Sequence, residues 1–195
     1  EQVSTFKIRY SDAVAPDRPT PDVLMDFNQA ARICGLGEIG LGGFFLTPRF
    51  GPFQRFAFIL TDAELAADPV AETTLCDRCG ACIAACPGQA LSDAGDLDEW
   101  QCAAYRMGAD VNNNLFLDPE AVKAMPDGEE VLAGTKRFDE ESFGRWKGLW
   151  NEAYPQMRFG YNPALCGLAC QRACLTKLEN RDVLQDKFAN HFRGE

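Results

Sequence analysis

The sequence predicts an α+β protein in two parts, a partial α/β segment over residues 1–70 and a mostly helical domain over residues 71–195. Helical and strand-like patterns alternate in the first part. In the second part helical patterns dominate, and five of the nine cysteines fall between Cys76 and Cys102. A composition of 46% hydrophobic and 25% charged residues is that of an ordinary globular protein, so extensive disorder is excluded.

The elements of both parts are defined by local start and stop residues. Thr20 is the predicted cap of a helix that ends at Gly35, and a glycine-rich loop follows it. Two short apolar runs, residues 44–47 and 55–61, are predicted strands, and the prolines and the glycine between them mark the break from one strand to the next. The other predicted elements are a strand over residues 5–10 and helices over residues 97–106, 119–125, 139–153, 163–180 and 182–191.

The charge and the apolar content exclude two classes of partner. The chain has 29 acidic and 19 basic side chains, a net charge of −10, and no run of lysines or arginines. A nucleic acid is therefore not expected as a direct partner. No apolar stretch approaches the roughly 20 residues of a membrane span, and no charged leader precedes an apolar one. The first residue is Glu1 rather than Met. We expect the protein in the cytoplasm.

The most specific motif is the cysteine run from Cys76 to Pro87. It reads C-x2-C-x2-C-x3-C-P, the run that binds cubane [4Fe–4S] clusters in bacterial ferredoxins. Thiolates separated by two residues can wrap one face of a cluster, and the small residues Gly80 and Ala81 let the backbone approach its sulfides. A zinc site with four cysteine ligands is the alternative, since C-x2-C pairs also bind zinc. The odd number and short spacing of the cysteines favour metal ligation over disulfides.

The motif implies a second cluster, because its fourth cysteine binds a different cluster from the first three. Cys102 and a C-terminal run supply the further thiolates, and the i, i+4 spacing of that run places its members near one helical face. The first cysteine set is then Cys76, Cys79, Cys82 and Cys174, and the second cysteine set is Cys86, Cys102, Cys166 and Cys170. Cys34 is left over, and its place on a helical apolar stripe predicts a buried thiol without a ligand role.

The glycine-rich loop over residues 35–43 matches the G-x-G-x-x-G dinucleotide fingerprint, and Asp62 lies 22 residues beyond Gly40. The context argues against a nicotinamide or flavin site. That fingerprint needs a strand before it and a helix after it, whereas here a capped helix precedes the loop and a strand-like run follows.

Several short motifs occur in a fixed order along the chain. They are Cys-Gly-Leu-Gly-Glu-Ile-Gly from Cys34, Phe-Leu-Thr-Pro-Arg-Phe-Gly-Pro from Phe45, Arg55, Leu-Thr-Asp ending at Asp62, the cysteine run, and Leu-Asp-x-x-x-Cys ending at Cys102. In these motifs the chain resembles a family of corrinoid iron–sulfur enzymes that includes epoxyqueuosine reductases and reductive dehalogenases. The resemblance covers roughly residues 25–106 and 162–176. It implies part of a corrinoid-binding domain followed by a two-cluster ferredoxin-like domain.

The resemblance also implies cofactors: two [4Fe–4S] clusters that feed electrons to a cobalamin held over the glycine-rich loop. The residues that it implies for cobalamin binding are Gly35, Gly37, Gly40, Thr47, Pro48 and Arg55. No catalytic residue is assigned. Only about 30 residues precede the loop, so the alternatives are a missing N-terminal domain, a partner subunit, or no corrinoid at all.

Three functions follow as hypotheses. The first is an oxidoreductase module or subunit that passes low-potential electrons to a corrinoid or another redox cofactor, with a donor such as ferredoxin or flavodoxin. The second is a complete cobalamin-dependent reductase of an organic halide or of the epoxide in tRNA, and the net charge disfavours the tRNA substrate. The third is a protein whose clusters are only structural. A ferredoxin-type carrier without corrinoid is a variant of the first.

Overall fold

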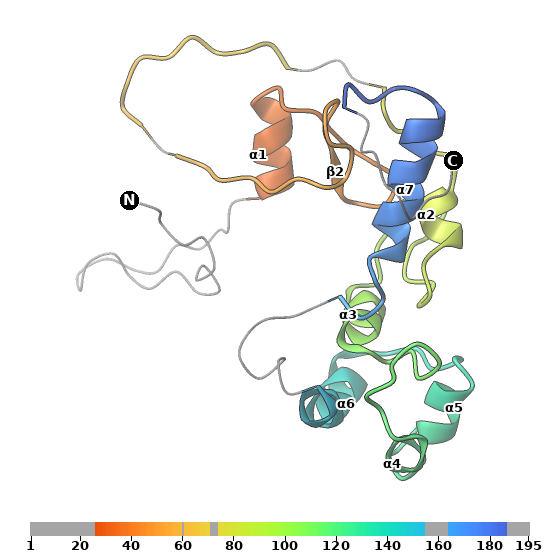
Figure 1. Ribbon diagram of the computed structural model, residues 1–195. Coiled ribbons are helices and arrows are strands. Elements are labelled where there is room, and N and C mark those ends of the chain that lie inside the picture. The colour runs from red at the N-terminus through yellow and green to blue at the C-terminus, as the bar shows by residue number, and fades with distance from the viewer. Residues whose placement is uncertain (1–25, 60, 71–73, 155–163, 187–195) are drawn as a thin grey trace, which may run out of the picture.

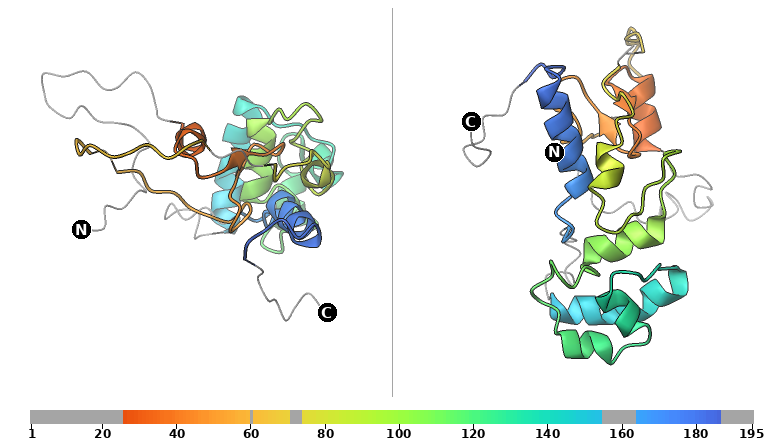
Figure 2. Two further views of the ribbon diagram at one scale, coloured as in Figure 1. Left: turned by 90° about the horizontal axis from the view of Figure 1, so that it is seen from above. Right: turned by 90° about the vertical axis from the view of Figure 1, so that its right-hand side faces the viewer.

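The computed structural model describes residues 26–59, 61–70, 74–154 and 164–186, which form two tiers (Figure 1). The upper tier in Figure 1 contains α1 (Phe27–Ile33), β1 (Glu38–Ile39), β2 (Phe45–Leu46), α2 (Ala81–Ala84) and α7 (Ala169–Asn180). The lower tier contains α3 (Glu99–Met107), α4 (Pro119–Lys123), α5 (Gly128–Leu132) and α6 (Glu140–Ala153). The side view in Figure 2 keeps this division. The described part is thus α+β, as predicted, and none of its helices is long and apolar enough to cross a bilayer.

The upper tier starts with a short helix and a hairpin. The Asp26 carboxylate caps the first turn of α1, and the helix ends before Gly35, whose φ of 75° is typical of a residue that follows a helix. The predicted cap at Thr20 lies outside the described residues. β1 and β2 pair antiparallel, with Glu38 opposite Leu46, so the second half of the glycine-rich loop connects the strands of a hairpin.

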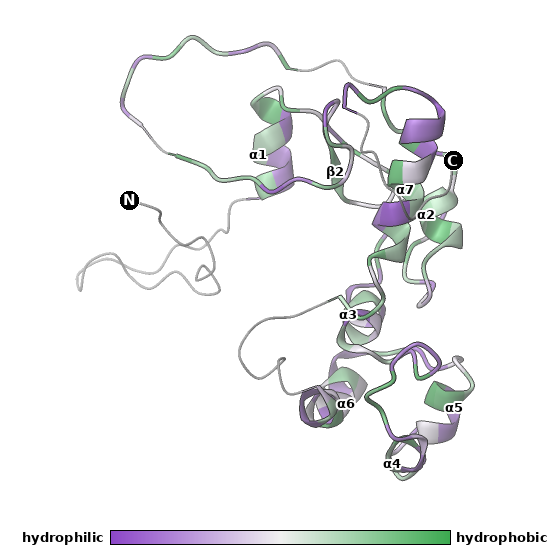
Figure 3. Cartoon of the chain, viewed as in Figure 1, coloured by the Kyte–Doolittle hydropathy of each residue, from purple (hydrophilic) through white to green (hydrophobic). Residues whose placement is uncertain are grey.

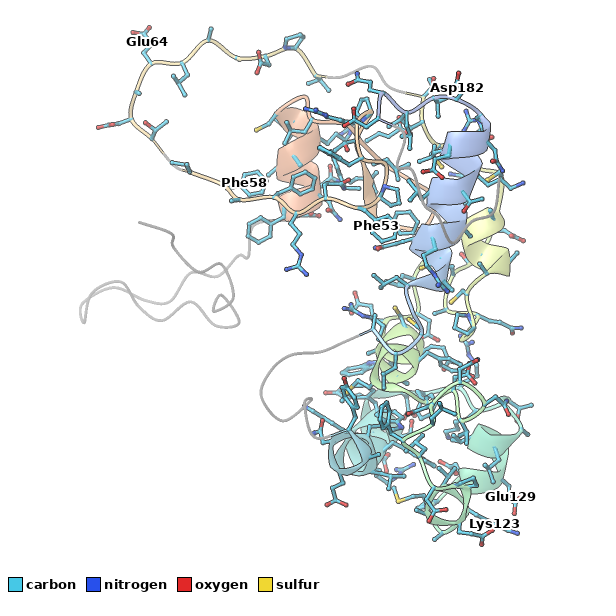
Figure 4. All side chains as sticks on the ribbon, viewed as in Figure 1. Phe53, Phe58, Glu64, Lys123, Glu129 and Asp182 are labelled. Atoms are coloured by element: carbon cyan, nitrogen blue, oxygen red, sulfur yellow. The ribbon has the colours of Figure 1, made fainter. Side chains whose placement is uncertain are left out.

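The predicted strand over residues 55–61 is wrong over the residues that the structure describes. Its backbone has no ladder partner among the described strands, and a strand requires one. Its two phenylalanines instead pack on the hairpin and on α1: the rings of Phe56 and Phe45 lie 4.9 Å apart, and Phe58 contacts Phe27 of α1. Residues 61–70, the exposed linker that follows, lie outside any helix or strand, and Figure 4 shows Glu64 of this linker far from the body of the protein.

The lower tier has an aromatic core of its own. Trp146 and Trp150 of α6 are fully buried, and Phe138 packs edge-on against both rings. The helix begins with a capping box in which Asp139 and Ser142 exchange hydrogen bonds. Figure 3 shows both hydrophobic and hydrophilic residues on α6, as expected for a helix that covers a core with one face.

A buried amide ties this core to the cysteine run. Gln101 of α3 donates from Nε2 to the carbonyls of Gly88 and Lys136, at 3.0 and 3.3 Å, and accepts from the N–H of Phe138 at 2.9 Å. Arg137 also donates to the Gly88 carbonyl, at 3.1 Å. Because a buried amide left without partners would be costly, this network fixes α3 against the start of α6.

Helix boundaries differ from prediction where the backbone turns left-handed. α7 begins later than predicted because Gly167 and Leu168 have φ values of 64° and 51°. The helix predicted over residues 182–191 is absent from its described part, since Asp182 has a φ of 56°. Its remaining residues lie outside the described part. The five-residue α5 was not predicted, because so short a helix has little periodicity.

Gly144 of α6 is expected to give a stabilising substitution. A Cβ added there meets no atom within 4 Å, and glycine inside a helix costs roughly 0.5–1 kcal/mol relative to alanine. Gly144→Ala should therefore raise the free energy of unfolding by about that amount, as measured by urea denaturation. Gly134→Ala is the control. That position is equally open but has a φ of 69°, so this substitution should lower the free energy of unfolding. A loss of stability in the Gly144 variant would contradict the prediction.

Candidate metal centre

Four cysteines from distant parts of the chain meet between α2 and α7. Cys76 and Cys79 precede α2, Cys82 lies within it, and Cys174 lies in α7. All four line one partly open cavity with an empty volume of about 360 Å³. These are the members of the first cysteine set, so the structure brings that set together. Their role as cluster ligands stays a prediction.

The second cysteine set also comes together. Cys170 of α7 lies close enough to Cys86, Cys102 and Cys166 for a negative charge on any of them to raise its pKa. Burial is the larger cause, and it raises the pKa of Cys170 to about 11. The pKa of Cys102 is raised in the same way, first by burial. Two groups of four thiols are thus assembled from the same two segments of sequence.

Helix α7 connects the two sets. Cys170 belongs to the second set and Cys174 to the first, and the two are one helical turn apart. At a rise of 1.5 Å per residue they are separated by about 6 Å along the helix axis. α7 packs directly on α2, and the two helices run side by side in Figure 1. The cysteine run around α2 therefore meets both thiols of α7.

The cysteine run reaches this geometry through left-handed backbone. Arg78 and Gly80 have φ values of 57° and 72°, which turn the chain between successive cysteines. Gly80 adopts this conformation without steric cost, and a Cβ there would meet no atom within 4 Å. The three thiols of this segment can then face the same cavity.

Backbone N–H groups donate hydrogen bonds to sulfur in both sets. The N–H of Leu41 donates to Cys76 Sγ, and the N–H of Ala90 donates to Cys86 Sγ, each at 3.3 Å. Such bonds stabilise negative charge on sulfur and affect the reduction potential of a cluster. The carboxylate of Glu38 accepts from the N–H of Cys76 at 2.6 Å. The glycine-rich loop is therefore attached directly to the first cysteine set.

Burial raises the pKa of Cys82, Cys102, Cys170 and Cys174, so these four thiols hold their protons when no iron is bound. Burial, with the negative charges of the other three cysteines, raises the pKa of Cys174 to about 12. Cluster binding therefore has to release protons. The pKa of these thiols is higher in the folded apoprotein than in the unfolded chain. Their contribution to the free energy of unfolding is therefore largest below the ordinary thiol pKa of about 8.5, and it is lost as the pH rises toward the raised pKa values.

The two sets fit four-iron clusters. Each set offers four thiols, the number of cysteine ligands that a [4Fe–4S] cluster takes. Within the described ranges, no three His, Cys, Asp or Glu side chains approach closely enough to hold a single metal ion. A cubane places its ligands further apart, because each thiolate binds a different iron.

The glycines assigned to cobalamin by resemblance have different surroundings. Only Gly40 lines the cavity of the first set. Gly35 ends α1, and Gly37 packs against β2 so closely that a Cβ there would lie 2.0 Å from the carbonyl oxygen of Leu46. Two of the three glycines thus have a structural reason to be glycine.

The other three residues assigned to cobalamin lie outside that cavity as well. The Thr47 hydroxyl accepts a hydrogen bond from the N–H of Phe50 at 3.1 Å within a turn. The Pro48 carbonyl accepts from the N–H of Gln185 at 2.9 Å, and Arg55 is exposed. Of the six residues only Gly40 lines the cavity of the first set, and their cobalamin role stays a prediction.

Four residues near the first set were not assigned any role from the sequence. They are Glu38, Leu41, Lys177 and Arg181. The two cationic residues follow Cys174 by three and seven positions, a helical spacing that could have indicated them. Nothing in the sequence indicates the contact of Leu41, because it acts through its backbone N–H.

Cys34 lies outside both sets, but its predicted burial is wrong. The thiol is exposed at the end of α1, a helix of which only Ala31 is buried. We expect Cys34→Ala to leave the iron content and the visible absorption unchanged, because no cluster thiol is removed. Cys166→Ala is the matched control and should lose one cluster. Loss of iron from the Cys34 variant would show that the ligand sets are wrong.

Comparison with known proteins agrees with this site. The 4Fe-4S binding domain family matches residues 69–92. Tetrachloroethene reductive dehalogenase of Desulfitobacterium hafniense is 43% identical over 65 residues, which are 32% of this chain and 12% of that protein. Epoxyqueuosine reductase of Synechococcus sp. (strain CC9605) is 35% identical over 94 residues, 48% of this chain and 28% of that protein. The epoxyqueuosine reductase of Cellulophaga algicola is 40% identical over 72 residues, which are 36% of this chain and 23% of that protein. No solved structure matches the chain.

The matches cover only part of each protein. The aligned segments span between 12% and 28% of the lengths of these relatives. The match to the 4Fe-4S binding domain includes the cysteine run, and together with the relatives it supports an iron–sulfur redox role. The resemblance inferred from the sequence is confirmed: residues 69–92 match the 4Fe-4S binding domain family, and part of the chain is similar to reductive dehalogenases and epoxyqueuosine reductases.

Proposed function

We propose that the chain is an electron-transfer module with two [4Fe–4S] clusters, which passes low-potential electrons to a corrinoid or another redox cofactor. The observation that carries the proposal is the gathering of eight cysteines into two sets that share α7. The first set would hold one cluster and the second set the other. When bound, each cluster supplies a site that accepts and releases one electron.

The surroundings of the two sets favour a direction of transfer. The first set lies under the glycine-rich loop through the contacts of Glu38 and Leu41 with Cys76. The second set lies against α3, toward the lower tier. We therefore assign electron exit to the first set, on the side of the loop, and electron entry to the second.

We also propose that the chain divides near residue 70 into the segment 1–70 and the double-cluster domain 71–195. The exposed linker supports this division. The two parts remain in contact, because Leu46 of β2 packs with Leu175 and Leu178 of α7. The hairpin therefore acts as part of the wall around the first set.

The partners of the module are inferred from its relatives. These relatives are named as a reductive dehalogenase and as epoxyqueuosine reductases, and each is several times longer than its aligned segment. We therefore propose a further domain or subunit that contains the substrate site, with ferredoxin or flavodoxin as electron donor in the cytoplasm. A complete cobalamin-dependent reductase, of the dehalogenase or the epoxyqueuosine type, is the alternative for the whole protein.

A second candidate is a ferredoxin-type carrier without corrinoid. The contacts of Gly35 and Gly37 favour it, because they explain both glycines without any macrocycle. In this case the loop only closes the cavity of the first set.

Anaerobic reconstitution of the full chain tests both candidates. We expect about eight iron and eight sulfide per chain and a broad visible absorption that dithionite bleaches. Added cob(II)alamin should co-elute with the protein and change its visible spectrum if the first candidate is right. Reducible clusters without corrinoid binding, in the chain alone and together with the further domain or subunit, would favour the second candidate. Iron near four, or stoichiometric zinc, would contradict the two-cluster proposal itself.

A further inference from the structure

One face of α7 carries a regular series of side chains. Cys170, Cys174, Lys177 and Arg181 follow one another at spacings of four, three and four residues, which keeps them on the same side of a helix. Lys177 and Arg181 line the cavity of the first cysteine set, together with the anionic Asp77. In Figure 3 the end of α7 toward Asp182 is strongly hydrophilic. Two cationic side chains and one carboxylate thus lie next to the first set.

Arg181 is bound to the residues on both sides of Cys76. Its Nη1 donates to the carbonyl of Leu75 at 2.7 Å and lies 3.3 Å from the carboxylate of Asp77. Leu75 is buried, and the Arg181 side chain is only 31% exposed. The arginine therefore fixes the chain around Cys76 against the helix that carries Cys174. Lys177 is exposed.

We propose that Arg181 is a positioning and charge-compensating residue for the first cluster. This inference rests on the proposed electron-transfer function. A cluster held by four thiolates is anionic, and reduction adds one more negative charge. A cation at the cavity wall stabilises the reduced state more than the oxidised state, and partial burial keeps this attraction from being fully screened. The planar guanidinium can serve a carbonyl and a carboxylate at once.

The potential of each cluster in variants of Arg181 tests the charge. The full chain is reconstituted anaerobically and is then reduced stepwise in the presence of mediator dyes, so that each cluster takes up one electron. EPR follows the signals of the two reduced clusters. The signal lost in Cys174→Ser identifies the first cluster. Arg181→Gln should shift the midpoint potential of that cluster to a more negative value and leave the second unchanged. Arg181→Lys keeps the charge and should restore most of the wild-type potential.

The control is Arg145→Gln in α6. Arg145 has a similar exposed fraction, 37%, and also pairs with carboxylates, those of Glu141 and Asp127. It belongs to the lower tier, so both potentials should stay at their wild-type values. A shift in this variant would show that loss of any arginine has the same effect and would overturn the proposal.

The remaining outcomes are distinguishable. If the midpoint potential of the first cluster is the same in the wild type and in Arg181→Gln, charge compensation is overturned. If Arg181→Gln and Arg181→Lys shift this potential equally, the effect comes from geometry alone, and charge compensation is again overturned. If Arg181→Gln fails to assemble the first cluster, Asp77→Asn decides, because removing that negative charge should shift the potential to a less negative value. An unshifted Asp77 variant then overturns the proposal. A wild-type chain without any cluster signal overturns the proposed function, whereas clusters with unresponsive potentials overturn only this inference.

Discussion

Cys174→Ser is expected to remove one cluster and leave the other. Iron should fall from about eight to about four per chain, because the first cysteine set loses one of four ligands. The free energy of unfolding should fall strongly as well, since the binding of a metal centre and the folding of its site are coupled. Iron analysis, EPR of the reduced protein and denaturant unfolding under anaerobic conditions measure these effects.

Double variants test how the ligands are divided. Cys79→Ser combined with Cys174→Ser should still retain about four iron, because both residues belong to the first set. Cys170→Ser combined with Cys174→Ser should lose nearly all iron, although these two residues are neighbours on one helix. If the second pair retained four iron, the two thiols of α7 would share a cluster and the crossed assignment would be wrong.

Gly37→Ala should cause the second large effect, a loss of roughly 2–4 kcal/mol in the free energy of unfolding. A Cβ at this position would lie 2.0 Å from the carbonyl oxygen of Leu46, and the φ of 156° is itself rare for other residues. The hairpin strands would have to separate, which would expose Leu46 of β2, a residue that is fully buried. Urea denaturation of the apoprotein measures the loss.

Gly43→Ala is the matched control in the same loop. Its φ is 74°, but an added Cβ meets no atom within 4 Å, so only the cost of the left-handed conformation remains, about 1–2 kcal/mol. Similar losses in both variants would show that the contact of Gly37 with β2 is unimportant. The comparison also concerns cobalamin, because a Gly37 variant that fails to bind it would report a broken hairpin. Gly43 is the better position for that experiment.

The cysteine sets could be predicted because ligand spacing is a local property. The spacing of Cys76 and its neighbours reflects the shape of a cluster, and the spacing of Cys170 and Cys174 reflects the helical turn. Helix starts at Asp118 and Asp139 were also predictable, since each carboxylate caps its own helix. These features depend on only a few neighbouring residues.

The features that were missed depend on contacts between distant segments. The apolar run over residues 55–61 predicts a strand, but a strand also needs a neighbouring strand to pair with, and the described residues offer none. The helical stripe that includes Cys34 predicts burial, yet nothing among the described residues covers that thiol. The bond between Arg181 and Leu75 joins residues 106 positions apart, and no periodicity indicates it.

The shared helix α7 sets the separation of the two proposed redox centres in a particular way. Cys170 and Cys174 are joined by a single hydrogen-bonded turn, so the spacing between their sulfur sites is determined by covalent and backbone geometry. Movement of one tier against the other alters the surroundings of the second centre but leaves the length of this connection unchanged. Electron tunnelling declines steeply with distance. The hop between the centres should therefore keep a nearly constant rate while the rest of the molecule fluctuates.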